Sequence, residues 1–84
     1  MEKSKIETVL GMCVVTLTKY IMKIQNIGYE AAYKRLLTTE LYKLLQDSRT
    51  QLLLETNEYL CEACRIELMK GKEELYEYIN SDDF

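Results

Sequence analysis

The chain of 84 residues contains no histidine and no proline, and it has only three glycines. Without histidine, a serine or cysteine nucleophile lacks its usual base, and a zinc site lacks one of its two commonest ligand types. No glycine-rich loop is present to hold phosphate groups. The shortage of helix-breaking residues, together with the lack of alternating hydrophobicity, favours helices joined by short turns. We therefore predict a protein without catalytic residues or cofactor, which is not an enzyme.

Long apolar runs are also missing. The uncharged run at residues 8–18 is far shorter than the roughly 20 residues needed to cross a bilayer, and Lys19 and Lys23 follow it closely. No small-residue cleavage site follows it. We therefore expect no membrane contact and a cytoplasmic protein. The odd number of cysteines, three, also fits a reducing compartment better than a disulfide framework.

Charge is divided unequally along the chain. Residues 1–50 carry eight Lys/Arg and five Asp/Glu, a net charge of +3, whereas residues 51–84 carry three and nine, a net charge of −6. The acidic second half disfavours binding to phosphates, so we predict no nucleic-acid partner. A small nucleic-acid-binding regulator is kept as an alternative function. The acidic half would either attract a basic partner or complement the basic half within the fold.

Apolar residues at helical spacing predict two long helices. The first begins at the capping-box spacing of Ser4 and Glu7 and ends near residues 26–28, with Gly28 as a left-handed cap. Its predicted core face comprises Ile6, Val9, Leu10, Cys13, Leu17, Tyr20, Ile21 and Ile24. The second runs from Thr50 to about Met69 as one central helix. Its predicted core face comprises Leu53, Leu60, Cys64 and Leu68, and this face is widened on one flank by Leu52, Tyr59, Ala63 and Ile66.

Two short helices are predicted between the long ones. Residues 29–37 would turn Ala32, Tyr33, Leu36 and Leu37 to the core, and residues 40–46, capped by Thr39, would bury Leu41, Leu44 and Leu45. At Gly71 the chain either breaks or continues as a helix, because Leu68, Leu75 and Ile79 share a face. We predict an all-α fold in one domain, residues 1–84, with a frayed tail at 80–84. Two long helices bracket two short helices, with a short C-terminal helix or extension.

The short helices resemble a known family. The run from Gly28 to Leu37 (GYEAAYKRLL), followed by residues 39–45 (TELYKLL), is similar to small bacterial all-helical proteins of unknown function. Members of that family are often encoded beside a predicted ADP-ribosyltransferase-like toxin. The resemblance implies an antitoxin or toxin-accessory role with a toxin-like protein partner. The family often has a His-Thr pair after the short helix, where this chain has Arg49-Thr50.

The only chemical motif is the pair Cys61 and Cys64, three residues apart on the predicted central helix. A structural zinc site needs four ligands, and the chain adds only Cys13 to this pair. Thiols tuned for redox chemistry usually sit at a helix N-terminus that follows a strand, which is not predicted here. We therefore interpret all three cysteines as core residues. A cysteine-based metal-binding protein is the first alternative function.

Surplus apolar surface suggests a binding partner. Met12 and Val15 lie outside the predicted core face of the first helix, and the seven tyrosines are too many for a core of this size to bury. Tyrosine is favoured at protein interfaces. We therefore predict a non-catalytic protein–protein interaction module that forms a homodimer. The predicted interface residues are Met12, Val15, Thr16, Lys19, Tyr29 and Tyr33.

Overall fold

The computed structural model describes residues 3–81, without the side chains of residues 3–6, 48 and 81. Its α-helices are α1 (Lys3–Gln25), α2 (Tyr29–Leu37), α3 (Glu40–Gln46), α4 (Asn57–Lys70) and α5 (Lys72–Ser81). Two short 3-10 turns, η1 (Ser48–Thr50) and η2 (Leu52–Leu54), lie between α3 and α4. Because the described residues form no strand, the prediction of an all-α fold is confirmed. The predicted bounds of α2 and α3 are those observed.

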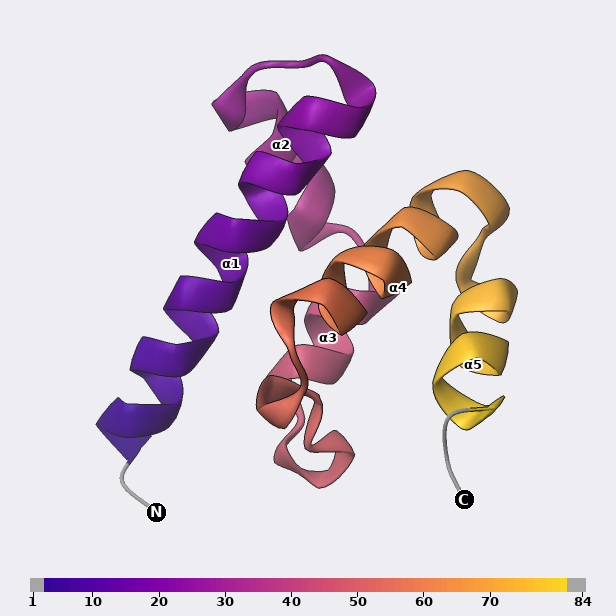
Figure 1. Cartoon of the computed structure of the whole chain (residues 1–84). Coiled ribbons are helices and arrows are strands. Elements are labelled where there is room, and N and C mark those ends of the chain that lie inside the picture. Colours follow the sequence, from indigo (N-terminus) through magenta and orange to yellow (C-terminus); the bar gives the residue numbers. More distant parts are fainter. Residues whose placement is uncertain (1–2, 82–84) are drawn as a thin grey trace.

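The helices form a thin assembly. Helix α1 runs along one side with α2 folded back against it, while α4 packs against α1, α3 and α5 (Figure 1). The described part of the chain measures 36 × 29 × 19 Å. A thickness of 19 Å accommodates about two helix diameters of about 10–12 Å each. A helix on the outside of such an assembly is therefore covered on one side only.

The core draws on all five helices. Leu60 of α4 is 1% exposed, as predicted. The other large apolar side chains with at most 1% exposure are Leu17, Ile21, Leu36, Leu41, Leu45 and Leu75. The predictions for Leu53 and Leu68 are wrong in part, because both are only half-buried at the edge of this cluster. On the predicted flank of the core face, Leu52, Ala63 and Ile66 are buried.

The predicted central helix from Thr50 is wrong in its first two turns. Gln51 adopts a left-handed conformation with φ of 57°, which interrupts any helix at that point. The turn lets Leu52 enter the core, and α4 then begins after Thr56, whose side chain accepts a hydrogen bond from the Tyr59 N–H at 3.1 Å. The arrangement of two long helices around two short ones is therefore replaced by one long helix and four shorter ones.

The end of α1 is formed by a residue other than the one predicted. Asn26, with φ of 54°, is the left-handed residue, and the Ile27 N–H donates to the Met22 carbonyl at 3.3 Å in a Schellman-type closure. Gly28 instead has extended backbone and precedes the first turn of α2. Asparagine tolerates the left-handed region, so the helix can end before the glycine is reached.

At the other end of the chain, Gly71 separates two helices. Its φ of 106° is unfavourable for other residues, and it ends α4 and allows α5 to fold back beside α4. The alternative of one helix continuing through Gly71 is therefore wrong. Asn80 and Ser81 belong to α5, and the remaining residues of the predicted tail, 82–84, lie outside the described part.

Several predicted side-chain orientations need correction. Val9, Tyr33 and Leu37 were assigned to the core but are 38%, 39% and 36% exposed. Leu44 is half-buried rather than buried. The backbone is helical from Lys3 onward, so Ser4 lies inside α1 and not at its start. The capping hydroxyl of Ser4 and the predicted core position of Ile6 fall among the undescribed side chains.

Candidate interaction surface

One side of α1 packs on the core, and the opposite side is uncovered by the described residues. Cys13, Leu17 and Ile21 face inward with at most 7% exposure. The uncovered side, which we call the outer face of α1, comprises Thr8, Val9, Met12, Val15, Thr16 and Lys19. Met12 is 66% exposed and Val15 is 42% exposed. Beside them, a Cβ added to Gly11 would meet no atom within 4 Å.

A hollow of about 500 Å³ continues the outer face toward the C-terminal end of α1. Its apolar walls are Met22, Ile27 and Tyr29, and its polar lining is supplied by Lys19, Lys23 and Asn26. The hollow exists because the chain turns sharply at Asn26, which sets the start of α2 to one side of the last turn of α1. The outer face therefore has an apolar N-terminal half and a hollow bordered by lysines at its other end.

The predicted interface residues are all on the surface except Thr16, which is half-buried. Tyr29 is 45% exposed, and Tyr33 is exposed on the same helix, α2. Tyr29 lines the hollow and so joins the outer face. Of the other tyrosines, Tyr76 is exposed, and none of the seven is buried. Tyr59 and Tyr78 instead pair with each other, with ring centroids 5.0 Å apart.

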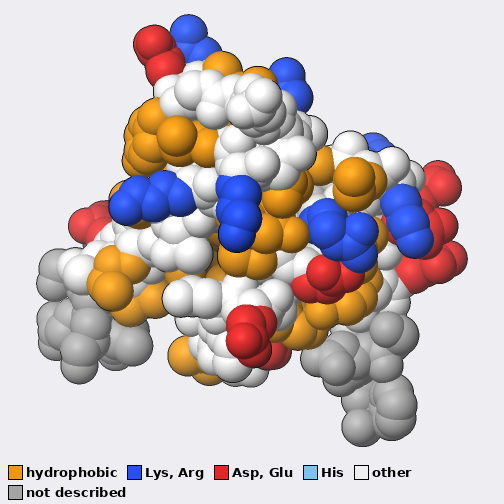
Figure 2. Space-filling view, turned by 45° about the horizontal axis from the view of Figure 1, so that its top comes forward, with side chains coloured by type: hydrophobic (Ala, Val, Ile, Leu, Met, Phe, Trp, Pro, Cys, Tyr) orange, Lys and Arg blue, Asp and Glu red, His pale blue; other side chains and the backbone are white. Residues whose placement is uncertain are grey.

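The charged residues on the outer face of α1 and around the hollow are all basic. Between Thr8 and Tyr29 the sequence contains no Asp or Glu, whereas Lys19 and Lys23 are exposed on α1. Figure 2 shows hydrophobic and basic side chains side by side on the viewed face, with several acidic side chains at the edge where α5 lies and others at separate points of the same face. The outer face thus combines apolar side chains with positive charge, and α5 carries exposed Glu73, Glu74 and Glu77.

The three cysteines are packed among core residues, with no metal-ligand cluster around them in the described part of the chain. Cys13 and Cys64 are buried and Cys61 is half-buried, and all three thiols are free. No group of three or more metal-ligating His, Cys, Asp or Glu side chains comes together within residues 3–81. Burial raises the pKa of the Cys61 and Cys13 thiols, and burial followed by the nearby Glu67 carboxylate raises the pKa of Cys64 to about 12. These environments suit packing thiols and oppose the thiolate that a metal requires.

These thiol environments predict an order of chemical modification. At pH 8, iodoacetamide should label Cys61 slowly and should leave Cys64 unmodified in the folded protein, because the thiolate is the reactive form and a pKa of about 12 keeps it scarce. Peptide mass spectrometry after timed quenching measures both positions. In denaturant the two should react at similar rates. Faster native labelling of Cys64 than of Cys61 would contradict this assignment.

A polar cluster that sequence reasoning missed joins three helices at the start of α3. The Glu67 carboxylate of α4 accepts hydrogen bonds from the backbone N–H groups of Glu40 and Leu41, at 2.6 and 3.0 Å. The Tyr76 hydroxyl of α5 donates to Glu40 Oε2 at 2.8 Å, and this bond raises the pKa of Tyr76. Two N–H groups at this helix start are thus already bonded within the chain. The sequence indicates an inward position for Glu67 only through its helical spacing from Ala63 and Cys64, which are buried.

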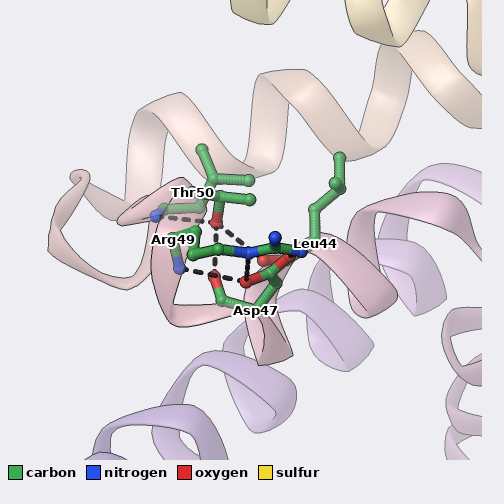
Figure 3. Close-up of polar contacts among 5 residues, drawn as sticks. Leu44, Asp47, Arg49 and Thr50 are labelled. Carbon is green, nitrogen blue, oxygen red and sulfur yellow. Dashed lines mark hydrogen bonds and ion pairs between the residues drawn. The ribbon is translucent and has the colours of Figure 1, made fainter.

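The Arg49-Thr50 position forms a compact turn after α3. The Arg49 guanidinium pairs with both oxygens of Asp47, at 2.9 and 3.1 Å, which lowers the pKa of that carboxyl (Figure 3). The Thr50 hydroxyl lies 2.7 Å from the carbonyl of Leu44 and 2.9 Å from that of Asp47. Because the Arg49 side chain is exposed, the ion pair contributes little to stability. The arrangement explains a turn and points to no reaction.

No protein-family model matches the chain, and neither curated proteins nor solved structures include a significant match to it. Among residues 3–81, none of the helices has the length and apolar character required to cross a bilayer. The surface that remains as the candidate site is the outer face of α1 with its hollow.

Proposed function

We propose that this chain is a non-catalytic protein-interaction module that self-associates through the outer face of α1. The observation that carries the proposal is the row of Val9, Met12 and Val15, exposed on the side of α1 opposite the core. Exposed apolar side chains that form a contiguous patch mark interaction sites, whereas scattered ones need no explanation. Leu54 and Met69 are also exposed, but they belong to η2 and α4, and Leu54 lines a separate hollow with Tyr59 and Ile79.

A two-fold homodimer is the simplest assembly for such a face. In a two-fold pair the same patch of both copies meets itself, so no new open surface is created. The lysines at the edge of the apolar row can lay their aliphatic stems along it and keep their ammonium groups in water. The predicted interface residues Met12, Val15, Thr16 and Lys19 form the centre of this proposal, with Tyr29 and Tyr33 at its side.

The resemblance to toxin-associated proteins remains a prediction, as does a cytoplasmic location. A toxin-like partner could occupy the same face of α1 in place of a second copy. The two possibilities differ in the mass of the purified protein, which stays that of one chain if only a different protein covers the face. The cysteine-based alternative has no cluster of ligands to support it within the described residues.

A pair of matched substitutions tests the proposal. Met12→Lys should weaken association at least about tenfold, or about 1.4 kcal/mol, because it introduces two further ammonium groups into an apolar seam already bordered by Lys19. Leu54→Lys is the control, because Leu54 is 80% exposed and lines a separate hollow with Tyr59 and Ile79. Sedimentation equilibrium measures the association constant, and circular dichroism verifies the helix content of both variants. Equal masses for the two variants, whether monomeric or dimeric, would argue against the outer face.

A further inference from the structure

The outer face of α1 is asymmetric along its length. Its N-terminal half, from Thr8 to Val15, presents apolar and small side chains, and its C-terminal half presents Lys19 and Lys23 around the hollow. Residues 8–29 include no Asp or Glu, and no acidic side chain lines the hollow. The repulsion between the lysines of two paired faces therefore depends on whether the two α1 helices run parallel or antiparallel.

A parallel pair of α1 helices would place Lys19 beside the partner's Lys19. In an antiparallel pair whose two-fold axis passes beside Val15 and Thr16, Lys19 and the partner's Lys19 are seven positions apart, or about 10 Å along the helix axis. The same axis separates the two copies of Lys23 by about 22 Å. Since charges farther apart than about 8–10 Å are largely screened at physiological salt, the antiparallel pair removes the repulsion that the parallel pair contains.

In the antiparallel pair the outer faces of the two copies also fit each other in shape. With the axis beside Val15, Met12 of one copy comes opposite the partner's Lys19, whose aliphatic stem can cover it. The turn that carries Thr8 and Val9 comes opposite the partner's hollow, where Met22 supplies an apolar wall. The apolar N-terminal half of each α1 thereby meets the C-terminal half of the partner's α1, where the hollow can receive it. In a parallel pair the two hollows would face each other.

We propose that two copies of this chain pair their α1 helices antiparallel, with Met12 over the partner's Lys19 and the Thr8–Val9 turn at the partner's hollow. This inference rests on the proposed self-association and specifies its geometry. The paired face, from residue 8 to 23, is about 22 Å long and one helix, about 10 Å, wide. Even with Tyr29 alongside, that is small compared with stable interfaces, which bury about 800 Å² per partner. We therefore expect a dimer that dissociates at micromolar concentration and exchanges its subunits.

Disulfide cross-linking between two single-cysteine additions tests the geometry. Thr8→Cys and Lys23→Cys are prepared separately, and each is oxidised alone and after mixing. The antiparallel pair places position 8 opposite position 23, so the mixture should give at least about tenfold more covalent dimer than either variant alone. The unmodified chain is the control for its three native cysteines, of which none lies on the outer face.

Each other outcome has a defined meaning. Cross-linking of each variant alone, at the yield of the mixture, would overturn the antiparallel arrangement in favour of a parallel pair. A sample that is dimeric by mass but does not cross-link would also overturn it, and it would leave self-association standing. A sample that stays monomeric by mass would instead remove the proposed function on which the inference rests, and would favour a different protein with acidic side chains as the occupant.

Discussion

Replacing Leu60 by alanine should lower the free energy of unfolding by about 2–5 kcal/mol. Leu60 is 1% exposed in the first turns of α4, and it belongs to the same buried cluster as Leu17 and Ile21 of α1. The loss combines the transfer of the removed methyl groups with the cavity that remains, because neighbouring helices relax only in part. Urea unfolding followed by circular dichroism, at one fixed protein concentration, measures the change.

Leu54→Ala is the matched control for that experiment. Leu54 lies six residues earlier in the same leucine-rich stretch but is 80% exposed, so its truncation should change the unfolding free energy by less than about 0.5 kcal/mol. The contrast between the two leucines tests the placement of α4 after the η2 turn. A loss of less than about 0.5 kcal/mol for Leu60→Ala would mean that Leu60 faces solvent and that the phase of α4 is different.

Removal of the Glu67 carboxylate should have the second largest effect on stability. In Glu67→Ala the backbone N–H groups of Glu40 and Leu41 lose their acceptor, and α3 loses its connection to α4. We expect a cost of about 2–3 kcal/mol, because two partly buried donors become unsatisfied at once. Glu67→Gln retains one acceptor oxygen and should cost about half as much. Thermal or urea unfolding of both variants measures the difference.

An exposed glutamate provides the reference for the Glu67 variants. Glu73→Ala removes a carboxylate from the first turn of α5, where it is exposed, and should change stability by less than about 0.5 kcal/mol. If Glu67→Ala behaved like Glu73→Ala, water would be satisfying the α3 donors, and the link between α3 and α4 would be of no energetic consequence.

The sequence was sufficient to predict elements whose signals are local. Helix α2 follows from its apolar spacing, and α3 follows from the Thr39 cap, whose side chain accepts a hydrogen bond from the Tyr42 N–H at 3.1 Å. The end of α1 was predicted within a few residues for the same reason. In each case the residues that start or end the helix lie within it or directly beside it in the sequence.

The stretch from Thr50 to Leu54 could not be predicted because its structure depends on distant contacts. Three consecutive leucines fit a helix or a buried turn equally well, and periodicity does not distinguish them. The turn is favoured over a helix here by contacts with the rest of the fold. Leu52 fits the core, Gln51 adopts a left-handed backbone, and the Thr50 hydroxyl donates to the Leu44 carbonyl at the end of α3. The role of Glu67 was hidden in the same way, since its partners lie 26 and 27 residues away.

The candidate surface could be predicted only in part. Met12 and Val15 were identified because they lie off the core face of α1, and both are exposed as expected. Val9 joins them although its spacing placed it in the core, because the described helices leave that edge of α1 uncovered. The hollow beside Met22 could not be foreseen, since it depends on the turn at Asn26.

Light scattering of the unmodified chain across micromolar concentrations tests the central proposal most directly. One chain has a mass of 9.9 kDa. Self-association through the outer face of α1 predicts a weight-average mass that rises with concentration toward twice that value. For the Met12→Lys variant, the mass at the same concentrations should return toward that of one chain. A mass that stays at 9.9 kDa at every concentration would contradict the homodimer.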